Sequence, residues 1–156
     1  VAYGEDRAVR VESAMRRMRV GQFALWDLGG ISPDQPLINA LRGGLRDMVV
    51  TESGWVVGML WRNRLLAEMG KTASGRIVRD VMDLDPVTVD IDTPLHDVHQ
   101  LMEEQGLWAV PVIEAGIYRG IFTGDRFRHI YNQLSPDPVQ TARQYLSRGP
   151  LAHLRA

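Results

Sequence analysis

The stretch VRDVMDLDPVTVDIDTPLHDVHQLMEEQGLWAVPVIEAGIYRGIFTGDRF, from Val78 to Phe127, decides the fold. Apolar residues at helical spacing alternate in it with short β-rich runs and turn residues. The predicted elements are a strand at 87–89, a helix from Pro94 that Gly106 ends, strands at 109–113 and 118–123 with a tight turn at 114–116 between them, and a helix from Asp125. The order strand, helix, strand, strand, helix indicates an α/β (α+β) unit.

The same pattern occurs twice in the chain. When Val20–Leu37 is laid on Val78–Leu95, identical residues coincide, and Met48–Leu60 then falls on Val110–Phe122 with matching glycines. The first repeat is the shorter one. Its predicted elements are a short helix around Leu37–Leu41 that Gly43 and Gly44 interrupt, a hairpin that turns at Ser53 and Gly54, and a helix over about Arg62–Glu68.

The repeats predict the division of the chain. The expected segments are an N-terminal amphipathic helix or linker (1–19), the first repeat (20–70), a polar linker (71–76), the second repeat (77–134) and a C-terminal tail helix (135–156). Because the first residue is Val1 and not Met, we expect the chain to be part of a longer or processed polypeptide.

The second repeat resembles a CBS domain. The residues that carry the resemblance are V-R-D-V-M at 78–82, D-P-V-T-V at 85–89, D-T-P-L at 92–95, A-V-P-V at 109–112 and G-I-F-T at 120–123. Two such repeats are similar to a tandem CBS pair, or Bateman module, which implies two units packed with pseudo-twofold symmetry and flanked here by N- and C-terminal helices. The resemblance also implies a regulatory domain rather than an enzyme, a homodimer, and an attached or partner effector domain that the pair controls.

The resemblance further implies a ligand, an adenine nucleotide (AMP, ADP or ATP) or S-adenosylmethionine, although no cofactor is certain. Each repeat is expected to contribute one cleft. In the second repeat the adenine would lie against Val87, Thr88, Ala109, Val110 and Pro111, and the phosphate and ribose side near Thr123, Asp125 and Arg126. The alternative is that Thr123 or Asp125 caps the last helix and that the apolar residues are core.

The sequence departs from the family pattern at the ribose position. The expected aspartate is Arg126 in the second repeat and Arg64 in the first, where Trp61 also replaces the threonine. The indole would either fill the first cleft or stack on a base. We expect it to fill the cleft, which would then be empty of nucleotide. Arginines at these two positions could instead grip a polyphosphate or a dinucleotide, or lie solvated on a helix surface.

Composition excludes several classes of function. A formal net charge of −1 gives no general attraction to nucleic acid, and no apolar run is long enough for membrane insertion. The chain has no cysteine, which fits a cytoplasmic location, and His96 and His99 lack a third ligand for a metal.

A basic N-terminal helix that leads into a CBS pair resembles the C-terminal end of site-2-type membrane metalloproteases in its layout, so the cytoplasmic face of a membrane protein is also consistent. Two hypotheses remain: a sensor of an adenosine-containing ligand, and a ligand-free pair that acts as a dimerisation or docking scaffold.

Overall fold

The computed structural model describes residues 2–24, 30–69, 71 and 75–134. The elements are α1 (Ala2–Arg17), η1 (Val20–Gln22), α2 (Leu37–Leu41), β1 (Met48–Glu52), β2 (Trp55–Leu60), α3 (Arg62–Glu68), η2 (Val78–Asp80), β3 (Asp83–Leu84), β4 (Val89–Asp90), α4 (Leu95–Gln105), β5 (Ala109–Glu114), β6 (Ile117–Thr123) and α5 (Gly124–Leu134). The strand-helix-strand-strand-helix order is confirmed in the second repeat, although the strand expected at 87–89 is shifted to Val89–Asp90. In the described part of the first repeat, the first strand is reduced to a single bridge between Ile31 and Val50, followed by helix, strand, strand and helix. The predicted tail helix at 135–156 and residues 72–74 of the predicted linker lie outside the described residues.

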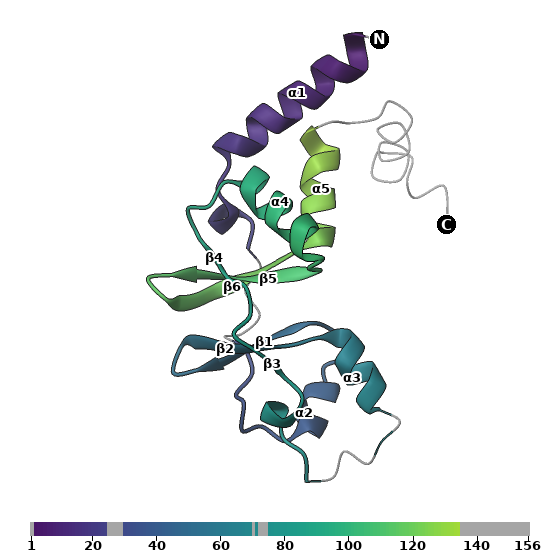
Figure 1. Ribbon diagram of the computed structural model, residues 1–156, viewed down its shortest axis with the longest axis vertical. Helices are drawn as coiled ribbons and strands as arrows, with labels where there is room; N and C mark the ends of the chain where they lie inside the picture. The colour runs from purple at the N-terminus through teal and green to yellow at the C-terminus, as the bar shows by residue number, and fades with distance from the viewer. Residues whose placement is uncertain (1, 25–29, 70, 72–74, 135–156) are drawn as a thin grey trace, which may run out of the picture.

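The chain is arranged in four layers (Figure 1). Helices α4 and α5 cover the outer face of β4, β5 and β6, with α1 beyond them, while α2 and α3 cover the outer face of β1, β2 and β3. The two groups of strands face each other across the middle of the molecule. The strand order is β1-β2-β6-β5-β4, with β3 paired to β2, and Trp55 pairs with Ile117 where the two hairpins meet.

Three clusters of buried side chains correspond to the three interfaces between these layers. The cluster under α4 and α5 contains Phe122, Leu95 and Val110, and the cluster at α2 and α3 contains Leu37 and Leu65. The middle cluster joins the repeats and consists of Val49, Met59, Ala109, Tyr118 and Ile121. Because the strands alternate their side chains, each hairpin supplies one outer core and the shared middle core at once.

The opening segment of each repeat packs on the other repeat. Val20 N donates to Thr93 O and Leu95 N to Met18 O, at 2.9 Å each. The same pair of bonds recurs across the molecule, where Val78 N donates to Gln35 O and Leu37 N to Arg76 O, also at 2.9 Å. Accordingly Val20 is buried with the second repeat and Val78 with the first. This reciprocal exchange gives the pair its pseudo-twofold symmetry.

Helix α1 contacts α4 and α5 through its C-terminal half, and its N-terminal half extends beyond them (Figure 1). It buries Val11 and Met15 in the cluster under these helices. On its exposed side Glu12 contacts Arg16 at 2.9 Å and His96 Nε2 at 3.2 Å. The hydrogen bond from Arg16 lowers the pKa of the Glu12 carboxyl. Of the helices in the described ranges, none has the length and apolar character needed to cross a membrane.

Candidate functional site: a cleft between the repeats

A cavity of about 190 Å³ opens between the two repeats. Most of its walls are apolar, and two carboxylates complete them. The lining residues are Trp61, Asp83, Leu84, Asp85, Pro86, Val87, Leu107, Ala109 and Pro111. Trp61 comes from the first repeat and the others from the second, so the site exists only when the two repeats are packed together.

One wall is the segment that leads into the second repeat. Strand β3 pairs with β2 through Gly58–Leu84 and Met59–Asp83. A Cβ on Gly58 would lie 2.7 Å from Met82 Sδ and 2.9 Å from Asp83 O, so only glycine allows this approach. Asp85 then adopts φ of 49°, a left-handed conformation that Asp and Asn tolerate better than most residues. This turn directs Pro86 and Val87 along the cavity.

The opposite wall is Trp61, between β2 and α3. Its side chain is half-buried and packs on the middle core cluster. Trp61 occupies the N-cap position of α3 without a side-chain cap of its own. The first backbone donor of that helix, Arg62 N, instead donates to Asp47 Oδ1 at 2.7 Å. A protein carboxylate therefore satisfies the first backbone donor of α3.

Three of the residues predicted for the adenine side line this cavity: Val87, Ala109 and Pro111. Thr88 is half-buried beside them in sequence but is not among the lining residues. Val110 is fully buried in the cluster under α4 and α5, on the other face of β5. This follows from strand alternation, since Ala109 and Pro111 share one face of β5 and Val110 lies on the opposite one.

The residues predicted for the phosphate and ribose side do not line this cavity. Thr123 Oγ1 accepts a hydrogen bond from Arg126 N at 3.1 Å, which is the capping arrangement considered above. Asp125 is exposed and lies 3.8 Å from Arg128. The Arg126 Nε atom is buried, and it has no hydrogen-bond partner in the part of the chain that the structure describes.

The cavity takes its lining residues from both repeats. Trp61 lies across the cavity from Val87 and Ala109, although it belongs to the other repeat. The physical reason is that the two groups of strands face each other, so a cavity between them has residues of both repeats in its walls. The alignment of the two repeats places Trp61 at the position of Thr123, a residue expected to contact the ligand. This equivalence could have identified Trp61 as a residue that lines the cavity.

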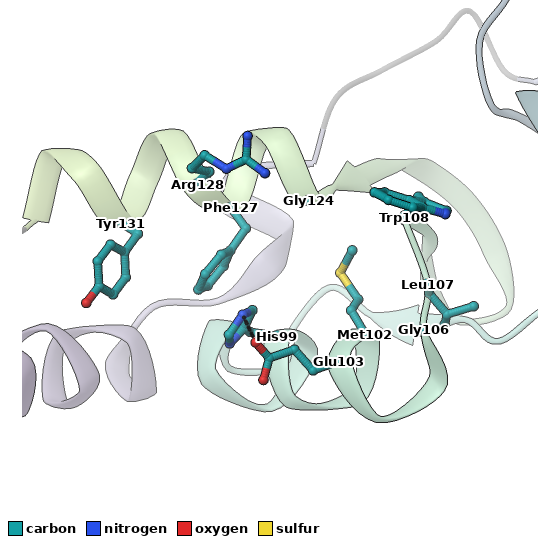
Figure 2. A pocket seen from close by; sticks show the side chains of 10 residues that line it. All are labelled: His99, Met102, Glu103, Gly106, Leu107, Trp108, Gly124, Phe127, Arg128 and Tyr131. Atoms are coloured by element: carbon teal, nitrogen blue, oxygen red, sulfur yellow. Dashed lines mark ion pairs between the residues drawn. The ribbon is translucent and has the colours of Figure 1, made fainter.

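A second, larger cavity of about 550 Å³ lies between α4 and α5 (Figure 2). Met102 points into it from α4, Phe127 and Tyr131 face it from α5, and Trp108 closes one end. The ring of His99 stacks on Phe127 with a centroid separation of 3.9 Å. Trp108 is 71% exposed, which is unusual for so large an apolar side chain.

The rim of this α4–α5 groove carries charges of both signs. Glu103 projects from α4 beside His99, at 3.1 Å from His99 Nε2, and Arg128 projects from α5. Both charged side chains are largely exposed. Within the described ranges, no three His, Cys, Asp or Glu side chains gather as they would to hold a metal ion.

Comparisons with known proteins agree with this architecture. The model of the CBS domain family matches residues 78–131. The structure of CBSX2 in complex with AMP is 27% identical, with a TM-score of 0.64 over 74% of this chain and 97% of that chain. CBSX2 from Arabidopsis thaliana is 23% identical over 76% and 97% of the two chains, with a TM-score of 0.65. AcuB from Vibrio cholerae, a putative acetoin utilization protein, is 17% identical, with a TM-score of 0.66 over 81% and 96%.

The chain is therefore a mixed α+β protein with the fold of a CBS pair. Residues 78–131 form a CBS domain, and the preceding repeat completes a tandem CBS module.

Proposed function

We propose that this chain is a regulatory CBS pair that senses an adenosine-containing ligand in the cleft between its repeats and controls an attached or partner effector domain. The observation that carries the proposal is the cavity between Trp61 and Val87, Ala109 and Pro111. Its apolar walls suit a flat heterocycle, which can stack on an indole. The similarity to CBSX2, whose structure contains AMP, supports an adenosine-type ligand.

The position of the cavity supports a regulatory role. A ligand there would touch both repeats, and each repeat holds the opening segment of the other through backbone hydrogen bonds. Ligand binding would therefore favour one relative arrangement of the repeats and, through Met18 and α1, the orientation of the N-terminal helix. An effector joined to that helix would receive the signal. We place this effector and the pair in the cytoplasm, including the cytoplasmic face of a membrane.

The sensor proposal predicts ligand-dependent thermal stability. A ligand that binds only the native state should raise the melting temperature by about 5–10 °C at a hundredfold excess over its Kd. The measurement is a thermal-shift panel of adenosine, AMP, ADP, ATP, NAD and S-adenosylmethionine. Val87→Trp, at a 37% exposed cavity residue, should abolish the shift by filling the space, whereas Val9→Trp on α1 should retain it. The absence of a shift with every compound would contradict the proposal.

The α4–α5 groove favours a second candidate function, that of a dimerisation scaffold. A projecting Trp108 beside a groove on the same face is the self-complementary shape that a twofold interface requires. In such a homodimer each Trp108 would enter the groove of the other copy, and Arg128 of one copy would face Glu103 of the other. This role requires no ligand, and it is also compatible with the sensor.

The scaffold proposal predicts that Trp108→Ala shifts the protein from dimer to monomer, with Kd for self-association raised by about 30-fold or more, as for an interface hot spot. The measurement is sedimentation equilibrium. Trp55→Ala removes an indole that is 54% exposed at the hairpin tips and should leave the dimer intact. Glu103→Arg and Arg128→Glu should each weaken the dimer, and their combination should restore it. A wild-type monomer at high concentration would overturn this proposal.

A further inference from the structure

The charges around the cleft indicate which adenosine-containing ligands can bind there. This inference rests on the proposed function. We infer that the cleft at Trp61 takes a nucleoside-type ligand without a phosphate, and preferentially one that carries a positive charge. The cavity itself provides the binding site, and the acidic residues that line it determine which ligands fit.

The size of the cavity is the first argument. At about 190 Å³ it lies below the range of roughly 300–1,000 Å³ that encloses whole drug-sized ligands. It therefore holds one ring system between Trp61 and the β5 residues Ala109 and Pro111. The remainder of the ligand must leave through the mouth, so the charges at the cavity edge act directly on it.

The lining charges are the second argument. Asp83 and Asp85 both line the cavity, and its described lining residues include no Lys, Arg or His. Both carboxylates are exposed at this edge. A phosphate group beside them would meet two like charges with no neutralising cation, whereas a sulfonium or ammonium group would meet two opposite charges.

The helix end is the third argument. A phosphate is often held by the backbone donors of a helix N-terminus and a nearby hydroxyl. Here Trp61 replaces the threonine, and Arg62 N already donates to Asp47 Oδ1 at 2.7 Å. The equivalent position in the second repeat does have a hydroxyl, but Thr123 lies outside this cavity, and its Oγ1 accepts a hydrogen bond from Arg126 N. At Trp61 the threonine hydroxyl is thus missing, and the first backbone donor of α3 is already taken by a carboxylate.

Two matched pairs of compounds test the inference by isothermal titration calorimetry on the whole chain. Adenosine against AMP changes only the phosphate, and S-adenosylmethionine against S-adenosylhomocysteine changes the positive charge on sulfur and its methyl group. We expect adenosine to bind about tenfold more tightly than AMP, and the sulfonium compound about tenfold more tightly than the thioether. Both ratios should shrink as salt is added.

The double variant Asp83→Asn/Asp85→Asn tests whether these two carboxylates cause the differences in affinity. Asn tolerates the left-handed conformation of residue 85, so the backbone should be retained. Both affinity ratios should fall to within about threefold of one, because the charges that produce them are gone. Asp125→Asn removes an exposed carboxylate outside the cavity and should leave both ratios unchanged. Ratios that persist in the double variant would contradict the assignment.

The outcomes separate this inference from the proposed function. If AMP binds as tightly as adenosine or more tightly, the inference is overturned while the sensor stands. If none of the four compounds binds, the inference fails, and the sensor proposal fails with it only when ADP, ATP and NAD also produce no thermal shift.

Discussion

Replacement of Phe122 by alanine is expected to lower the free energy of unfolding by about 3–5 kcal/mol. Phe122 on β6 is fully buried in the cluster between the strands β4–β6 and the helices α4 and α5. Its ring contributes to the contact of both helices with the sheet, so truncation loses its burial and leaves a cavity. Denaturant unfolding followed by circular dichroism measures the change.

The matched control for this prediction is Leu66→Ala. Leu66 lies on α3 and is largely exposed, so its truncation should cost less than about 1 kcal/mol. A similarly small loss for Phe122→Ala would mean that β6 is shifted by one residue, because such a shift moves the ring to the opposite face of the sheet.

Gly30→Ala is expected to cost about 2–4 kcal/mol, for two separable reasons. Gly30 has φ of 83°, and a Cβ built on it would lie 2.7 Å from Val49 O and 2.9 Å from Thr51 Cγ2. Val49 is a fully buried residue of β1, and its carbonyl accepts a hydrogen bond from Ile31 N at 2.9 Å, so the backbone there has little freedom to move.

Gly44→Ala separates the two causes in chemical denaturation experiments. Gly44 has a similar φ of 89°, but nothing lies within 4 Å of its Cβ position. Its substitution should therefore cost only the conformational penalty of about 1 kcal/mol. Equal losses for the two variants would show that Gly30 is not closely packed against β1.

Local elements could be predicted from the sequence because their signals are local. The short helices Leu37–Leu41 and Arg62–Glu68 have the predicted bounds, and Gly106 ends α4 in a left-handed conformation. The hairpin turns at Ser53 and Gly54 and at Ala115 and Gly116 also agree, since these residues have positive φ. In each case one or two residues determine the backbone.

The composition of the cleft could not be predicted in the same way. Val87, Ala109 and Pro111 were identified through the family resemblance, but Trp61 was assigned to a separate cleft of the first repeat. The exchange of opening segments depends on hydrogen bonds between residues far apart in the chain, such as Val20 N to Thr93 O, which no local pattern encodes. The hydrogen bond from Arg62 N to Asp47 Oδ1 also joins residues that are not close in the sequence.

An adenosine-type ligand should bind against Trp61 between the two repeats. The most direct measurement is the indole NH signals of the four tryptophans in a nitrogen-15 correlation spectrum, assigned with Trp61→Phe and recorded during titration with adenosine. If adenosine binds there, the Trp61 signal should shift in a saturable way. The signals of Trp55 and Trp108, which lie outside the cleft, should not change. An unmoved Trp61 signal at saturating adenosine, or a shift confined to Trp108, would contradict this prediction.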